Sequence, residues 1–176
     1  MDTSSAQALP TRDRSLTRRA TGAVAALVLA LGGLVALAAP ASAVTQAAAE
    51  STFRSAGITW SSSGGCSDPS NGTCTAFEGL RQATVDGAVT LRNASGCALN
   101  VTGGTETGHA GGTYSHANGY KLDFSLSTCL TGYVTGTFTY IGTRSDGAAQ
   151  YRSGSGNVYA KEGNHWDVLY NNCGGC

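Results

Sequence analysis

The chain has 176 residues and a net charge of zero, and charged residues make up only 12% of it. Without the N-terminal leader described below, the remaining residues are enough for one domain of ordinary size. After residue 43 seven basic residues face nine acidic ones, a net charge of −2, and no Lys or Arg cluster is present. The composition therefore gives no basis for nucleic-acid or polyanion binding.

Residues 1–43 have the pattern of a secretory signal peptide. Four arginines between positions 12 and 19 precede an apolar run over residues 23–39, and Ala41-Ser42-Ala43 is a small-x-small cleavage site. A membrane anchor is the alternative, but the run is marginal for a span of about 20 residues and ends at Pro40. We expect a secreted mature chain that begins at Val44 and keeps no membrane anchor. Arg18-Arg19 leaves both the Sec and the twin-arginine export routes open.

The mature chain is predicted to start with a leader and loop over residues 44–75, followed by a single folded domain over residues 76–176. Residues 45–56 are rich in alanine and favour either a short helix or part of a flexible leader. Residues 60–73 contain Ser, Gly, Pro and Asn and indicate a loop. Apolar residues near helical spacing predict a short amphipathic helix over residues 74–84.

Four strands are predicted beyond that helix. Residues 88–92 and 97–102 are rich in β-formers and bounded by Gly and Asn. Residues 120–126 and 165–170 alternate apolar and polar side chains, which gives each strand one face toward a core. Asp123 and His165 lie on the polar faces of these last two strands.

All six cysteines lie in the mature chain, which in an exported protein indicates disulfides. Six cysteines allow 15 pairings, and spacing alone does not choose among them. Our hypothesis pairs Cys66 with Cys74, Cys97 with Cys129, and Cys173 with Cys176. The last pair could instead be half of a zinc knuckle or a redox pair, but no second C-x-x-C accompanies it.

Two short motifs combine into a candidate zinc site. Ser115-His116 begins S-H-x-x-G-x-x-x-D, which ends at Asp123, and Glu162 begins E-x-x-H-W, which contains His165. Two imidazoles and one carboxylate are typical ligands of a catalytic zinc ion that keeps one position for water. Glu162 is close enough to His165 to act as general base without coordinating the metal.

The paired motif resembles the zinc D-Ala-D-Ala peptidases, a group that includes D,D-carboxypeptidases, vancomycin-resistance dipeptidases and phage endolysin peptidases. The resemblance covers roughly residues 80–170. It implies a hedgehog-like α+β fold, in which short helices flank a small antiparallel sheet that carries the zinc. It also implies one zinc ion per chain bound by His116, Asp123 and His165, with Glu162 as catalytic base.

The chain departs from this family where members carry S-G-Y-R, whose arginine holds the substrate or the oxyanion. The corresponding segment here, residues 102–106, ends in Glu106. Glu106 is therefore expected to bind a substrate amine, such as a diaminopimelate or lysine side chain. An endopeptidase is then as consistent with the sequence as a carboxypeptidase.

Three further residues are candidates for substrate contact. His109 lies in a Gly-rich loop and is either an oxyanion donor in place of the arginine or a solvated loop residue. Tyr114 and Ser115 precede His116 and could line the cleft.

The sequence thus predicts a monomeric, secreted, cell-wall-associated zinc metallopeptidase that hydrolyses peptide bonds of bacterial peptidoglycan. Two alternatives remain at this point. One is a zinc-bearing wall-binding module without turnover, and the other is a metal-free, disulfide-rich secreted protein.

Overall fold

The structure is a computed structural model, and it describes residues 43–171. The expected signal peptide, apart from Ala43, and the expected Cys173–Cys176 pair lie outside these residues. Within residues 43–171, none of the helices combines the length and the apolar character needed to cross a membrane.

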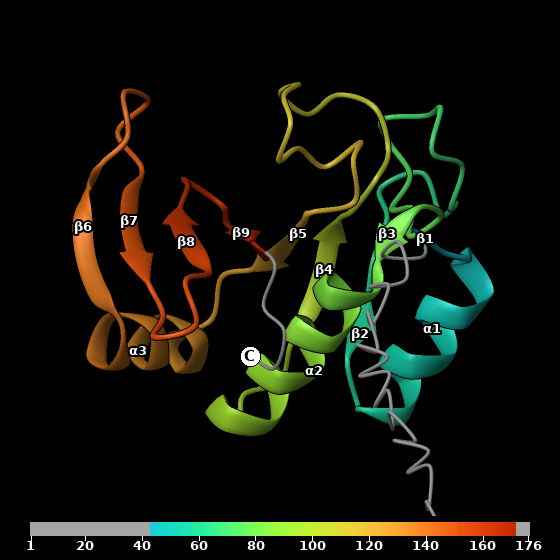
Figure 1. Ribbon diagram of the computed structural model, residues 1–176. Coiled ribbons are helices and arrows are strands. Elements are labelled where there is room, and N and C mark those ends of the chain that lie inside the picture. Colours follow the sequence, from blue (N-terminus) through green and yellow to red (C-terminus); the bar gives the residue numbers. More distant parts are fainter. Residues whose placement is uncertain (1–42, 172–176) are drawn as a thin grey trace, which may run out of the picture. The chain divides into compact units, whose positions relative to one another are not determined.

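A seven-stranded sheet organises the fold (Figure 1). Neighbouring strands are antiparallel except β2 and β4, which run parallel. A separate two-stranded sheet pairs β1 (Ala43–Val44) with β3 (Leu80–Arg81). In spatial order the large sheet consists of β2 (Thr59–Trp60), β4 (Asn100–Gly103), β5 (Lys121–Ser125), β9 (His165–Leu169), β8 (Val158–Lys161), β7 (Ala149–Arg152) and β6 (Thr139–Thr143).

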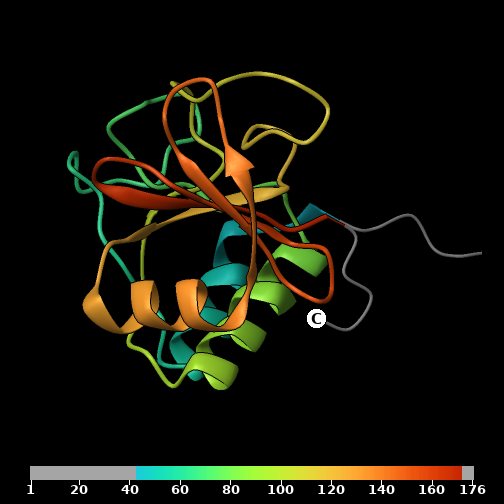
Figure 2. The ribbon, with the colours of Figure 1, turned by 90° about the vertical axis from the view of Figure 1, so that its left-hand side faces the viewer.

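The described residues form three helices: α1 (Gln46–Ser55), α2 (Gln82–Ser95) and α3 (Thr128–Thr137). Thr45 and Ser127 cap α1 and α3 by accepting a backbone N–H of the first turn, as such side chains do. Figure 2 shows the helices on one side of the sheet and the long loops on the other. The fold is therefore of the α+β class, as predicted.

The central strands β5 and β9 pack their apolar face against the helices. Leu122, Phe124, Trp166 and Val168 are fully buried in one core that also contains residues of all three helices. The Trp166 indole N–H donates to the Thr131 hydroxyl of α3 at 3.3 Å. The opposite, polar face of the same two strands is thus left for the loop side, as the alternating pattern predicted.

Residues 44–75 belong to the same core and do not form a separate leader. Phe53 of α1 is fully buried and packs edge-on against Phe77, with ring centroids 5.1 Å apart. Residues 59–60 form β2 at the edge of the large sheet. Of the two alternatives for residues 45–56, the helix is the one that forms, as α1, and the fold continues across the boundary expected after residue 75.

Two local predictions are wrong. Of the helix predicted over residues 74–84, only residues 82–84 are helical, as the start of α2, and residues 80–81 form β3. Residues 74–79 form no helix, and side chains take up backbone N–H groups there: Ala76 donates to the Glu106 carboxylate and Phe77 to the Gln46 amide oxygen. Residues 88–92 lie inside α2 and not in a strand. Their β-formers are accommodated because Ala88 and Leu91 continue the helical spacing that reaches the core.

Elsewhere, residues 120–126 and 165–170 contain β5 and β9 as predicted, and the strand expected at residues 97–102 begins later, at Asn100. The two-residue strands β1 to β3, helix α3 and strands β6 to β8 were not predicted from the sequence.

Two of the three expected cystine pairs are confirmed. Cys66–Cys74 joins residues eight apart within one loop. Cys97–Cys129 links the chain just before β4 to the first turn of α3, across 32 residues. The second bond therefore connects two elements of the core.

Candidate functional site

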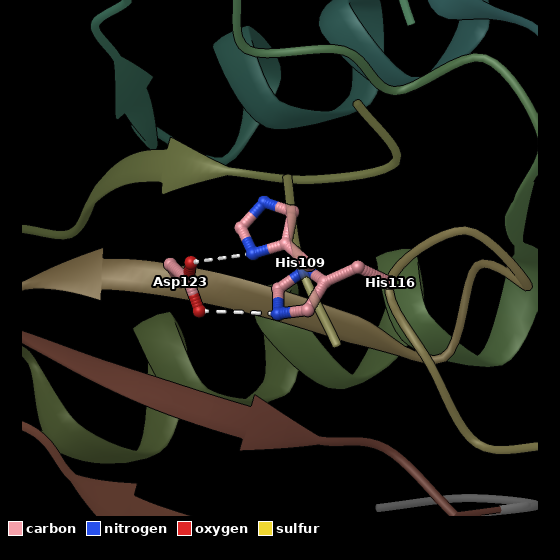
Figure 3. A group of neighbouring side chains, drawn as sticks. All are labelled: His109, His116 and Asp123. Atoms are coloured by element: carbon pink, nitrogen blue, oxygen red, sulfur yellow. Dashed lines mark ion pairs between the residues drawn. The ribbon is translucent and has the colours of Figure 1, made fainter. Parts of the chain in front are cut away.

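All three histidines of the chain surround one carboxylate, that of Asp123 on β5. The Nε2 atoms of His116 and His165 lie 3.3 and 3.5 Å from Asp123 Oδ1. His109 Nδ1 lies 3.7 Å from the other oxygen, Oδ2. Figure 3 shows His109 and His116 side by side, both directed at Asp123, and their rings stack with centroids 3.8 Å apart.

Strand register brings the two halves of the paired motif together. In the antiparallel β5–β9 pair, Asp123 lies opposite Asp167, and Ser125 lies opposite His165. Directly opposed residues share one face of a sheet, so Asp123, Asp167 and His165 all point to the loop side. Asp123 and His165, which are 42 residues apart in the sequence, therefore lie close together on neighbouring strands.

Gly103 on β4 makes room for the Asp123 side chain. A Cβ atom at position 103 would lie 2.5 Å from Asp123 Oδ2 and 3.1 Å from the His109 ring. Real Cβ atoms do not approach that closely, so only glycine fits while Asp123 and His109 keep these positions.

The turn that follows His116 holds this residue in place through Gly119. Gly119 has a φ of +74°, and a Cβ there would lie 2.3 Å from the Gly79 carbonyl oxygen. Its own carbonyl accepts hydrogen bonds from the Thr84 hydroxyl and the Arg81 backbone N–H. This turn brings His116 back toward Asp123, and it is anchored on the start of α2.

Hydrogen bonding determines which nitrogen of His116 faces the carboxylates. His116 Nδ1 lies 2.8 Å from the Gly104 carbonyl oxygen, which can only accept, so Nδ1 carries the proton. Nε2 is left facing Asp123 and Asp167, the latter at 3.7 Å. Although burial alone would lower it, contacts with Asp123 and Asp167 raise the pKa of His116 to about 9.

The two carboxylates retain unused oxygen atoms at the same point. Asp123 Oδ1 and Asp167 Oδ1 are buried and accept no hydrogen bond from a described residue. The other oxygen of Asp167 accepts from Lys121 at 2.7 Å and from Arg144 at 3.1 Å. Burial opposes the effect, but His116 and Lys121 lower the pKa of Asp167 below its usual range. The buried oxygens therefore favour a cation, either a proton on His116 or a metal ion.

Glu106 is buried and contacts the His109 ring from the interior of the protein. Its buried carboxylate accepts the backbone N–H groups of Ala76 and Gly104 and lies 3.1 Å from His109 Nε2. Burial would raise the pKa of Glu106, but the hydrogen bonds from His109 and the backbone outweigh it and lower that pKa. The Glu106 carboxylate is therefore buried and already hydrogen-bonded, and the expectation that it binds a substrate amine is wrong.

The E-x-x-H motif, from Glu162 to His165, forms the turn of the β8–β9 hairpin. The Glu162 backbone N–H donates to the His165 carbonyl at 3.0 Å, and this closes the turn. Both side chains consequently lie at the same end of the hairpin, with Glu162 Oε2 3.4 Å from His165 Nε2. Glu162 Oε1 accepts a hydrogen bond from Arg144, which reaches across from the turn between β6 and β7.

A cavity of about 500 Å³ collects these groups. Neither Tyr114 nor Ser115 lines it: Tyr114 is half exposed, and Ser115 is buried, where its hydroxyl accepts the Asn118 backbone N–H. The residues that line the cavity are Gly108, His109, Ala110, His116, Lys121, Asp123, Arg144, Asp146, Glu162, His165 and Asp167.

His109, His116 and Asp123 form a group that could hold a metal ion, because one ligand atom from each lies within 4.8 Å of the others. His165 approaches the same Asp123 oxygen as His116 does. In a tetrahedral zinc site with ligand distances of 2.0–2.1 Å, neighbouring ligand atoms are about 3.3 Å apart. The separations of His116 and His165 from Asp123 Oδ1 are close to that value. Among the described residues, however, the group whose ligand atoms all lie within 4.8 Å of one another contains His109 and not the predicted ligand His165.

The sequence indicates neither Arg144 nor Lys121 as part of the site, and for Asp167 it favours a surface carboxylate over a residue that orients a neighbour. Arg144 belongs to no motif, and only the β6–β7 hairpin carries it to the cavity. The role of Asp167 could have been predicted, because it lies two residues after His165 and therefore on the same face of the strand. No protein-family model, curated protein or solved structure matches the chain.

Proposed function

We propose that this protein is a secreted zinc peptidase that hydrolyses peptide bonds of bacterial peptidoglycan and shares the hedgehog-like D,D-peptidase architecture. One observation carries the proposal: His116 and His165, from the two separate motifs, approach the same buried oxygen of Asp123 within 3.5 Å. The signal-peptide pattern and the two disulfides support a site of action outside the cytoplasm.

The donor set suits zinc. Two imidazole nitrogens and one carboxylate oxygen are a ligand set found in catalytic zinc sites. The distant nitrogen of His116 is held by the Gly104 carbonyl and that of His165 lies 2.8 Å from the Asn164 side-chain oxygen, an arrangement typical of metal-binding histidines. A bound zinc ion would polarise the scissile carbonyl and lower the pKa of a water molecule to about 7.

Glu162 is the proposed general base. Arg144 holds Oε1, so Oε2 is the oxygen left beside His165. This oxygen takes a proton from the attacking water and returns it to the leaving nitrogen as the C–N bond breaks. Arg144 acts as a positioning residue for Glu162, and its three carboxylate neighbours keep its guanidinium in the cavity.

Mass spectrometry of peptidoglycan fragments incubated with the zinc-loaded protein tests the proposal, because it reports both turnover and the bond cut. Glu162→Gln should keep about one zinc ion per chain and lose at least about a hundredfold in rate. Glu50→Gln is the matched control, since Glu50 also pairs with an arginine, Arg54, but on α1. Full activity of Glu162→Gln would remove Glu162 from the base role.

Two other results would replace the proposal. Zinc binding and retention on sacculi without release of new amino groups would indicate a wall-binding module. Absence of zinc after removal of adventitious metal, with the fold intact, would indicate a metal-free disulfide-rich protein.

A further inference from the structure

The cavity at Asp123 continues into a second hollow between two hairpin turns. This hollow has a volume of about 710 Å³ and shares Asp146 and Glu162 with the first cavity. Residues of the turn between β6 and β7 and of the turn between β8 and β9 line this hollow. It is lined by Leu126, Asp146, Gly147, Ala148, Ala149, Lys161, Glu162 and Gly163.

A third hollow adjoins the second. It has a volume of about 600 Å³, shares Leu126 and Lys161 with the second hollow and reaches the first turns of α3. Each hollow thus shares two lining residues with the next, and the row of three adjoining hollows, which begins at the histidine cluster, is called the groove below. A ligand that occupied only the first cavity would leave most of this groove unused.

Charge along the groove is uneven. Arg144 pairs with the carboxylates of Asp146 and Glu162, which lie where the first two hollows meet, but its single positive charge is also shared with Asp167. Lys161 is exposed and forms no ion pair with another described residue. Lys161 is the one charged residue among the described residues that line the third hollow, where it favours an anionic group on the ligand.

We infer that the protein recognises an extended peptide on one side of the scissile bond, with a free carboxylate that reaches Lys161. This inference rests on the proposed function for the position of the bond, which lies at the histidine cluster. Several residues on that side of the bond would occupy the second and third hollows. Extension of the peptide on the other side would add little.

Binding, measured apart from turnover, tests the inference. The zinc-loaded Glu162→Gln chain is titrated with a capped dipeptide and with peptides that extend the same bond on its N-terminal side, its C-terminal side or both. One extension should tighten binding about tenfold or more, whereas the other should change it less than about twofold. Equal affinity for all lengths, or no binding at all, would overturn the inference.

Two further variants locate the effect. Ala149→Trp fills the second hollow and should abolish the gain from extension while the dipeptide binds as before. Ala47→Trp, on the exposed face of α1, is the matched control. Lys161→Gln leaves the packing unchanged and should lose several-fold affinity only for carboxylate-bearing peptides, in a salt-dependent manner. An undiminished gain in both Ala149→Trp and Lys161→Gln would also overturn the inference.

Failure of the proposed function gives a different result. A chain with intact Glu162 that cleaves none of these peptides, yet binds the extended ones more tightly, would retain the groove as a peptide-binding site. It would lose only its role as a peptidase.

Discussion

Raising the pH of the metal-free protein should destabilise it through His116. The folded-state pKa of His116 is about 9, whereas an unperturbed histidine titrates near 6.5. Folding therefore favours the protonated imidazole, and this contribution is fully present below pH 6.5 and lost as the pH rises through 9. The shift corresponds to about 3 kcal/mol, since each pKa unit is worth about 1.4 kcal/mol.

Urea unfolding between pH 6 and 9 in the presence of a chelator measures this effect. The free energy of unfolding should fall by about 3 kcal/mol over that range. His116→Gln should be less stable at pH 6 and should show most of this slope removed. A parent protein whose stability does not change between pH 6 and 9 would refute the assignment of a proton shared among His116, Asp123 and Asp167.

Three other outcomes follow from the same packing. Zinc binding at pH 7 should release about one proton per chain, because the metal displaces the proton on His116; calorimetry in buffers of different ionisation enthalpy measures it, and no release would contradict the ligand role. Gly103→Ala should weaken zinc binding and lower the free energy of unfolding by about 1–3 kcal/mol. Gly132→Ala, at an exposed position of α3, should raise that free energy by up to about 1 kcal/mol. Equal melting temperatures of the two variants would argue against the close approach at Gly103. Replacing Cys97 and Cys129 by alanine should cost about 3–4 kcal/mol in urea unfolding, and a loss below about 1 kcal/mol would mean that this cross-link adds little.

Some features were readable because they depend on local pattern. The period-two alternation of residues 120–126 and 165–170 predicted β5, β9 and the common polar face of Asp123 and His165. The glycine of the S-H-x-x-G-x-x-x-D motif, Gly119, lies in the turn after His116, and its positive φ is the reason that glycine is required there. The alanine-rich segment before Ala56 allowed a helix, and α1 formed.

Other features had no local signature. Residues 74–79 carry apolar side chains at a helical spacing, but partners 30 or more residues away take their backbone N–H groups. Glu106 is an acid in a Gly-rich loop by sequence, and only the fold turns it inward, beneath His109. Arg144 reaches Glu162 only because two hairpins lie side by side in the sheet.

The sequence by itself therefore determined the chemistry available to this protein: three imidazoles, a carboxylate on a polar strand face, and a glutamate one turn from a histidine. Residue type and short-range periodicity decide these, since both are local properties of the chain. Only the tertiary structure decided which atoms meet, because strand register and loop packing bring together groups that are far apart in sequence. It also decided which carboxylates face the cavity and which, like Glu106, are hydrogen-bonded in the interior. It brought Arg144 to the site and formed the groove, and no sequence motif indicates either.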